Sequence, residues 1–257
     1  MSYLVNPYMV SPSGSGFDMT GLKAYYKFDN ATGNLINQAT AVGSSDSNGV
    51  DFTNNSDVEQ DVTGLIDKAY KYKLLDGQSV DAGASTDWEF MYNTTSGVFS
   101  FVGWVKPNST DVTSSQIIFD NSNIENSTGT GLHVTGAAGN RKLSWFLSKS
   151  DNTDDTFPMG GNTYANTTAW RMLFISWNSS DGAVQMSVNN GTKTTGTSTI
   201  SGISGASVSP MSLGSARTSP EPIYEIDSIF DEFSFWNRVL TDDEVLALWG
   251  GGSGLAL

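Results

Sequence analysis

The carboxylates between Tyr224 and Glu232 are the residues of this chain that come nearest to a catalytic set. Hydrolysis of a glycosidic bond with retention of configuration needs two carboxyl groups about 5 Å apart, one as nucleophile and one as acid/base. Other catalytic sets lack parts, because the chain has no cysteine and a single histidine, His133. No serine stands in a Gly-x-Ser-x-Gly context, and no glycine-rich loop suited to a phosphate is present.

The carboxylate segment begins like the Glu-x-Asp-x-(x)-Glu strand of retaining glucanases, in which nucleophile and acid/base point into one cleft. Glu225 and Asp227 match the first two acids. The third acid would fall at position 229 or 230, where this chain has Ile229 and Phe230. The acid/base is therefore missing, and we expect a protein that is not an enzyme. His133 is interpreted as a half-buried or surface residue of a strand.

The C-terminal stretch 226–249 combines the period of a strand with the start of a helix. Thr241 and Glu244 form a capping box, which predicts a short helix from about Asp242 to Trp249, ended by the glycines at 250–252. Alternation predicts an inner strand over 226–236, with three apolar residues facing each side. These are Ile229, Phe233 and Phe235 on one face and Ile226, Phe230 and Trp236 on the other.

The segment from Asp231 to Glu244 closely resembles the last segment of laminin-G-like, concanavalin-A-like jelly-roll domains, Asp-Glu-(apolar)-x-(apolar)-(aromatic)-Asn-Arg-x-Leu-Ser/Thr-x-x-Glu. Residues 21–29, 67–77 and 98–107 resemble three further strands of that family. The resemblance implies an all-β fold, a concanavalin-A-like jelly-roll sandwich of two antiparallel sheets with a short C-terminal helix. The abundance of Gly, Ser, Thr and Asn suits many short strands joined by turns.

The predicted domain organisation has three parts. Residues 1–20 form an extended N-terminal docking arm and linker, 21–250 the laminin-G-like jelly-roll domain, and 251–257 a C-terminal tail. The arm carries apolar residues that would be costly to leave in water, namely Tyr3, Leu4, Val5, Tyr8, Met9 and Val10. We interpret it as a segment that docks on another chain; the alternative is that it folds back on its own domain.

The charge balance limits the partners of the protein. Thirteen basic and 27 acidic residues give a formal charge of −14, which would repel the phosphate backbone of a nucleic acid, so we expect no nucleic acid partner. The excess of acid serves solubility, or else some carboxylates bind calcium. No apolar run approaches the ~20 residues of a membrane span, and no export signal is recognisable, so we expect no membrane insertion.

Calcium is the one cofactor that the resemblance implies. Many relatives hold such an ion where the first and last strands lie together, and Asp29 and Asp231 occupy the matching strand positions. Calcium takes six to eight oxygen ligands, which carboxylates and loop carbonyls can supply. The alternative is that Asp231 only hydrogen-bonds the corner formed by Asn237 and Arg238.

Aromatic residues in polar loops are the candidates for binding a glycan. Trp88 and Tyr92 lie in the segment 86–93, and Tyr164 lies in an Asn-rich loop. Packing in the core of the sandwich is the common alternative for such residues.

Two functional classes remain open. The first is a non-enzymatic structural or adhesion protein of a virion surface, a capsid decoration or tail-associated protein of a bacteriophage, whose laminin-G-like domain binds cell-surface glycans and whose arm binds other virion proteins. The second is a free-standing, extracellular carbohydrate-binding module or calcium-dependent lectin. A homo-oligomer is a further expectation for either class.

Overall fold

The computed structural model describes most of the chain outside the N-terminal arm. The described residues are 17–54, 58–74, 78–83, 85–109, 115–122, 128–136, 141–149, 153–159, 164, 167–201, 203, 209–217 and 222–257. The predicted docking residues Tyr3, Leu4, Val5, Tyr8, Met9 and Val10 lie outside this part. No helix within it is long and apolar enough to cross a membrane.

The larger of two antiparallel sheets, sheet A, has eight strands. Seven follow the order β13-β12-β11-β6-β17-β4-β3, and β1 also pairs with β17. Their bounds are β1 (Leu22–Tyr26), β3 (Glu59–Thr63), β4 (Lys68–Tyr72), β6 (Val98–Pro107), β11 (Arg171–Asn178), β12 (Ala183–Val188), β13 (Thr194–Thr197) and β17 (Ser228–Trp236).

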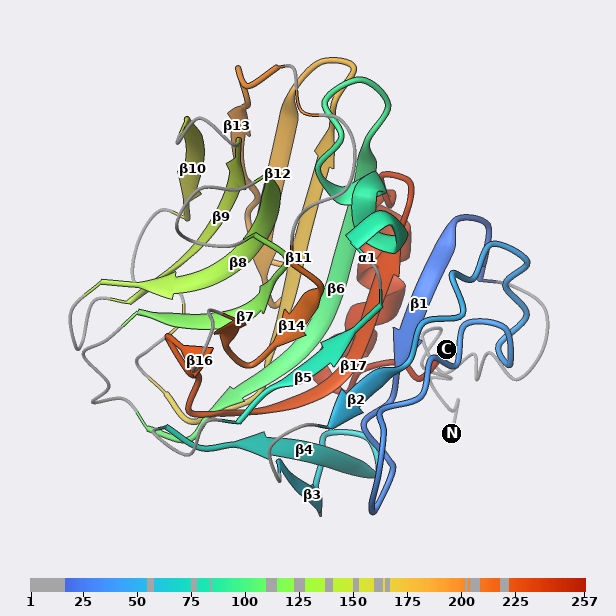
Figure 1. Ribbon diagram of the computed structural model, residues 1–257. Helices are drawn as coiled ribbons and strands as arrows, with labels where there is room; N and C mark the ends of the chain where they lie inside the picture. The colour runs from blue at the N-terminus through green and yellow to red at the C-terminus, as the bar shows by residue number, and fades with distance from the viewer. Residues whose placement is uncertain are drawn as a thin grey trace, which may run out of the picture.

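The second sheet, sheet B, has seven strands in the order β10-β9-β8-β7-β14-β5-β2 and is layered on sheet A (Figure 1). Its bounds are β2 (Phe52–Asn54), β5 (Val80–Ala82), β7 (Gln116–Asp120), β8 (Gly129–Thr135), β9 (Lys142–Ser148), β10 (Asp154–Pro158) and β14 (Met211–Leu213). The remaining elements are a two-stranded ribbon of β15 (Ala216–Arg217) and β16 (Pro222–Ile223), the 3-10 helices η1 (Ser85–Met91) and η2 (Gly250–Gly252), and one α-helix, α1 (Asp242–Trp249). This architecture confirms the predicted jelly-roll sandwich.

Alternation along β6 divides its side chains between two apolar clusters. Phe99 and Phe101 point between the sheets, where they join the main core. Val102 and Trp104 point to the outer face of sheet A, where α1 and the C-terminal tail cover them. The strand is therefore buried on both faces.

A β-bulge in β17 changes which residues face the core. The register of β17 against β6 shifts between Asp231 and Ser234, and Glu232 takes a positive φ of 53°. The bulge adds one residue and reverses the alternation beyond it, so Phe230, Phe233 and Phe235 all reach the main core. The prediction that Phe230 faces away from Phe233 and Phe235 was therefore wrong, because it assumed an unbroken period of two.

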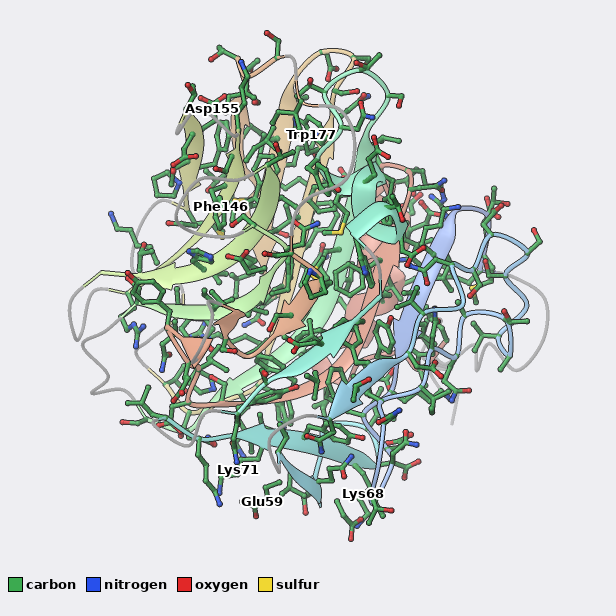
Figure 2. All side chains as sticks on the ribbon, in the orientation of Figure 1. Glu59, Lys68, Lys71, Phe146, Asp155 and Trp177 are labelled. Atoms are coloured by element: carbon green, nitrogen blue, oxygen red, sulfur yellow. The ribbon has the colours of Figure 1, made fainter. Side chains whose placement is uncertain are left out.

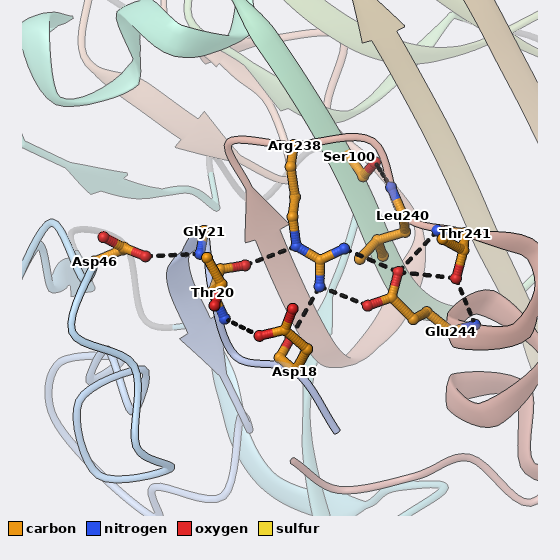
Figure 3. Close-up of polar contacts among 9 residues, drawn as sticks. All are labelled: Asp18, Thr20, Gly21, Asp46, Ser100, Arg238, Leu240, Thr241 and Glu244. Atoms are coloured by element: carbon orange, nitrogen blue, oxygen red, sulfur yellow. Dashed lines mark hydrogen bonds and ion pairs between the residues drawn. The ribbon is translucent and has the colours of Figure 1, made fainter. Parts of the chain in front are cut away.

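The C-terminal helix forms as its capping sequence predicts. Thr241 and Glu244 make the reciprocal capping box, and Gly250 closes the helix with a φ of 55°. Arg238 joins this cap to the start of the domain, because its guanidinium donates to Glu244 Oε1 and Oε2 at 2.6 and 2.8 Å and to the carbonyl of Thr20 at 2.7 Å (Figure 3). The corner before α1 thus fastens the first and last segments of the domain together.

Three strands at the edges of the two sheets are mostly polar. The residues of β3, β10 and β13 are mostly polar or charged and show little apolar alternation. Each pairs with a neighbouring strand on one side only. Pairing with that neighbour therefore forms β3 and β13, while Phe157 of β10 also stacks on Trp145 in the core with ring centroids 5.4 Å apart. Polar edges oppose pairing with other chains.

Candidate functional sites

Asp231 lies buried at the junction of the first and last strands of the domain. It is 0% exposed, and its Oδ2 accepts hydrogen bonds from the backbone N–H groups of Leu65 at 2.8 Å and Ile66 at 3.0 Å. Its Oδ1 has no hydrogen-bond partner. Asp231 therefore anchors the loop between β3 and β4. Its hydrogen bonds go to that loop and not to the corner at Asn237 and Arg238, as the alternative had proposed.

The bulge places Glu232 next to Asp231 on the same outer face of sheet A. The hydroxyl of Tyr25 donates to Glu232 Oε2, while Oε1 has no partner. Burial raises the pKa of Asp231 to about 8, although the backbone donors Ile66 and Leu65 oppose the shift. Burial likewise raises the pKa of Glu232 to about 8 against the hydrogen bond from Tyr25. Two adjacent buried acids thus resist ionisation.

Asp29 contributes a third charge to this junction. Burial raises its pKa, and its Oδ1 accepts a hydrogen bond from the backbone N–H of Lys68 at 3.1 Å. Repulsion from Asp29 adds to the upward pKa shifts of Asp231 and Glu232. Among the described residues, no three His, Cys, Asp or Glu side chains form a group that could hold a metal ion. The junction therefore offers two or three interacting carboxylates and would need further oxygens from carbonyls or water.

The predicted glycan-binding aromatics are buried. Trp88 and Tyr92 are 0% exposed and Tyr164 is 1% exposed. The ring of Trp88 packs edge-on against Phe235 in the main core, and the hydroxyl of Tyr164 lies 2.8 Å from Ser228 Oγ. The alternative of core packing holds for all three, since each belongs to the main core between the sheets. None of them offers a ring face to a ligand at the surface.

The outer face of sheet B carries a different set of side chains. Cross-strand pairing places Thr156, Phe146, Gly131 and Asp120 in one row across β10, β9, β8 and β7. The next row pairs His133 with Ser144. These positions alternate with the core residues Leu132, Val134 and Trp145, so they point away from the sandwich. We call this surface, formed by Asp120, His133, Ser144, Phe146 and Thr156, the outer polar face (Figure 2 labels Phe146).

A buried carboxylate orients the histidine of the outer polar face. Asp120 Oδ2 lies 2.9 Å from His133 Nε2, and Asp120 Oδ1 accepts hydrogen bonds from the N–H and hydroxyl of Ser122 at 2.6 and 2.8 Å. The His133 side chain is 17% exposed, which confirms its interpretation as a half-buried strand residue. Because Nε2 of His133 is hydrogen-bonded to Asp120, the other ring nitrogen, Nδ1, can form a hydrogen bond with a ligand.

Phe146 forms an aromatic platform beside that histidine. The two ring centroids are 4.3 Å apart at 60°. Gly131 makes the position of the Phe146 ring possible, because a Cβ at this glycine would lie 2.5 Å from Phe146 Cε1. Sequence reasoning missed Phe146 and Asp120; the alternation of Gly131 and His133 with core residues was the available signal.

The carboxylate segment that begins like a glucanase strand does not build a catalytic pair. Ile229 and Phe230 are buried at the positions where the acid/base would stand. Asp227 Oδ1 accepts a hydrogen bond from Asn108 Nδ2 at 2.9 Å. Asp231 and Glu232 lie on the outer face of sheet A under other segments of the chain, and the cavity beside Glu232 has a volume of about 10 Å³. That space holds about one water molecule and no sugar.

Comparison with protein families supports the architecture. A laminin-G-type family model, described as the concanavalin A-like lectin/glucanases superfamily, matches residues 75–246, which is more than half of the chain. A search of curated proteins returned no match.

Solved structures share the fold at low sequence identity. The binding domain of botulinum neurotoxin DC in complex with SialylT is 14% identical, with a TM-score of 0.64 over 90% of this chain and 51% of that one. The same domain in complex with rat synaptotagmin II is 14% identical, with a TM-score of 0.65 and the same coverage. The receptor binding domain of botulinum neurotoxin D is 13% identical, with a TM-score of 0.64 over 90% and 53%. The chain spans about half the length of these domains.

Proposed function

Because the chain belongs to the concanavalin A-like lectin/glucanases superfamily, we propose that it is a non-enzymatic binding domain that recognises a glycan through the outer polar face of sheet B. The observation that carries the proposal is the platform of Phe146 and His133, supported by Gly131 and oriented by the buried Asp120. The complex of a structural neighbour with SialylT is in keeping with a ligand-binding role for this architecture.

The outer polar face has the parts that a sugar needs. The ring of Phe146 can pack against the apolar face of a pyranose, while His133 and nearby hydroxyls, such as those of Thr135 and Thr156, exchange hydrogen bonds with its hydroxyl groups. Ser144 Oγ lies 3.0 Å from Thr135 Oγ, so this pair of hydroxyls is already aligned. A single platform suits one sugar residue, with the remainder of the glycan over neighbouring strands.

The absence of a catalytic role is part of the proposal. A retaining glycosidase needs two carboxyls about 5 Å apart that face one substrate. The outer polar face carries one carboxylate, that of Asp120, and its oxygens are hydrogen-bonded to His133 and Ser122. The face therefore offers no second carboxyl to act with it. We therefore expect the bound glycan to be released unchanged.

We further propose that the domain is displayed on a larger assembly, a bacteriophage virion surface as capsid decoration or tail-associated protein, through the arm at residues 3–10. Phe17, the first described residue, packs on the outer face of sheet A with Leu255 and Leu257 of the tail. The start of the domain therefore lies on the side opposite the outer polar face. An assembly bound by the arm would leave that face turned outward. The alternative is a free-standing extracellular lectin.

Calcium binding at the first and last strands belongs to the same proposal. The unpartnered, fully buried Oδ1 of Asp231 suits a cation, and Asp29 and Asp231 would hold it. Calcium would offset the repulsion among these carboxylates and stabilise their ionised form. Its role would be to fasten the first and last strands rather than to touch the glycan.

A glycan array tests the binding proposal. We expect the wild-type protein to bind a defined set of glycans, and Phe146→Ala and His133→Ala to lose at least about tenfold in affinity, which corresponds to about 1.4 kcal/mol. Leu246→Ala is the matched control, because Leu246 is an exposed apolar residue of α1 on the other side of the molecule. Equal binding by wild type and Phe146→Ala, or no bound glycan at all, would contradict the proposal.

Two further experiments test the arm and the ion. Deletion of residues 1–16 should abolish incorporation into the assembly and leave the melting temperature of the domain unchanged; assembly by the truncated chain would rule the tether out. Chelation of calcium should lower the melting temperature of the wild type, because an ion that binds only the folded state stabilises it. An unchanged melt at millimolar chelator would dispose of the calcium site.

A further inference from the structure

One end of the sandwich has a polar interior. There β6 ends and β7, β11 and β17 begin, and cross-strand pairs place polar residues at core-facing positions. Arg171 alternates with the core residues Leu173 and Ile175 of β11 and so points inward. Gln116 pairs with the core residue Val134 across β7 and β8 and points inward from the facing sheet.

Several donors at this end have no acceptor among the described residues. The Nε of Arg171, the Nε2 of Gln116 and the hydroxyl of Tyr72 are all buried without a hydrogen-bond partner. Gln116 is only 2% exposed, so water does not reach its side chain freely. A buried donor that lacks an acceptor costs about 1–3 kcal/mol relative to one that is satisfied. An unpartnered group of this kind needs a functional explanation.

The charge of Arg171 is also uncompensated in the described part of the chain. The protein has a formal charge of −14, yet no carboxylate forms an ion pair with this half-buried guanidinium. Burial lowers its pKa, and the neighbouring Tyr164 acts against this shift. Asp227 also faces this region, but its Oδ1 accepts the hydrogen bond of Asn108 Nδ2.

A second arginine lies in the same region. Arg141 is 2% exposed and donates to the carbonyl of Val134 at 3.5 Å. The charges of both arginines oppose the rise that burial causes in the pKa of Tyr164. The hydroxyl of Tyr164 lies 2.8 Å from Ser228 Oγ. Cationic and neutral donors therefore converge between the sheets in a chain that is otherwise rich in acid. An oxyanion can satisfy such donors, and the planar fork of an arginine matches a carboxylate or sulfate group.

We propose that this end of the sandwich binds an oxyanion of the carboxylate or sulfate class, with Arg171 as its charge partner and Gln116 Nε2 as a donor from the facing sheet. The site is separate from the outer polar face, since its residues point between the sheets. An acidic saccharide or a free inorganic anion would present the same chemistry, and the experiment distinguishes these two sources.

Thermal unfolding with paired probes tests the site. Wild type is melted in sodium glucuronate against glucose, and in sodium sulfate against sodium chloride at equal ionic strength. At a tenfold excess over the dissociation constant we expect a rise of about 4 °C with the binding anion. A response to glucuronate indicates a saccharide acid, and a response to sulfate alone indicates an inorganic or ester sulfate.

Arg171→Gln should lose that rise, and in chloride it should melt no lower than wild type, because it removes an uncompensated charge. Lys106→Gln is the matched control: it makes the same change of charge one residue beyond Val105, the partner of Arg171 in β6, and should keep the rise. The general stabilising effect of sulfate acts on all variants alike.

The proposal is overturned if Arg171→Gln responds to the anions as wild type does, or if wild type responds to none of them. Should Arg171→Gln fail to fold, Gln116→Leu decides in its place, and a full response in that variant would also overturn it. The test is independent of glycan binding by the outer polar face. Phe146→Ala should lose the array signal and keep the anion response, whereas Arg171→Gln should do the reverse.

Discussion

The outer faces of the two sheets differ although both belong to the same sandwich. On sheet A the outward residues are large and apolar, and α1, the tail and the segment at Phe17 cover them. On sheet B the outward positions hold glycine, serine, threonine and histidine beside the half-buried Phe146. The inter-sheet core forms in either case, because one face of each sheet suffices for it. Each outer face is therefore free to serve packing or binding. The outer face of sheet A serves packing, and we propose binding for that of sheet B.

The largest expected difference between the faces is in stability. Trp104 is buried on sheet A, and its ring stacks on Trp249 with centroids 5.2 Å apart. Trp104→Ala should lower the free energy of unfolding by about 3–5 kcal/mol, because it removes a large buried side chain and leaves a cavity. Denaturant unfolding measures the change. A loss below about 1 kcal/mol would mean that the cover of sheet A contributes little.

The buried acids of sheet A should make stability depend on pH. The folded protein keeps protons on Asp231 and Glu232 up to about pH 8, whereas the unfolded chain releases them near pH 4. Stability from these groups is therefore full at low pH and lost as the pH rises toward 8, by roughly 2 kcal/mol or more between pH 5 and 8.

Unfolding in urea at both pH values, with chelator present, measures this fall. Glu232→Gln should make it shallower, since an amide does not ionise. Ser144→Ala, on the outer face of sheet B, serves as the control and should leave the pH dependence of the unfolding free energy unchanged. An identical slope in Glu232→Gln and wild type would contradict the assignment.

The corner that fastens the two ends of the domain should have an intermediate effect. Arg238→Ala removes the fork to Glu244 and the bonds to the carbonyls of Thr20 and Asp18. We expect a loss of about 1–2 kcal/mol, since these are charge-assisted hydrogen bonds in a partly buried setting. Arg238→Lys should recover only part of it, because an ammonium cannot form the fork. Full stability in Arg238→Ala would show that the cover of sheet A does not depend on this corner.

The smallest stability effect is expected on the outer polar face. Phe146→Ala should change the free energy of unfolding by about 1 kcal/mol or less, because its ring is half-exposed and rests on Gly131. The same variant should lose glycan binding. A loss as large as that of Trp104→Ala would mean that Phe146 is a packing residue, and the contrast between the faces would fail.

Local signals in the sequence predicted the parts of this protein that depend on few residues. The capping box at Thr241 and Glu244 placed α1 correctly, and the alternation of β6 puts Phe101 in the core and Trp104 on the opposite face. The residue types Asn-Asn-Gly at 189–191 are likewise typical of a hairpin turn, and Asn189 and Asn190 both have positive φ. Each of these signals spans ten residues or fewer, so no distant contact was needed to interpret it.

The candidate functional residues were harder to predict because their surroundings come from distant segments. Trp88, Tyr92 and Tyr164 lie in polar stretches of sequence, yet the sandwich buries all three. Asp120 and His133 are 13 residues apart and meet only through the pairing of β7 with β8. The docking arm and the calcium ion remain predictions, to be tested by the deletion and the chelation described above.

The sequence by itself determined the all-β class and the capped final helix, since these depend on residue types and short spacings. The tertiary structure alone decided which face each side chain joined. A single extra residue at Glu232 reversed the alternation of β17, and strand pairing brought Asp120, His133 and Phe146 onto one surface. Register and bulges arise from contacts between strands far apart in the chain, and short-range patterns do not encode them.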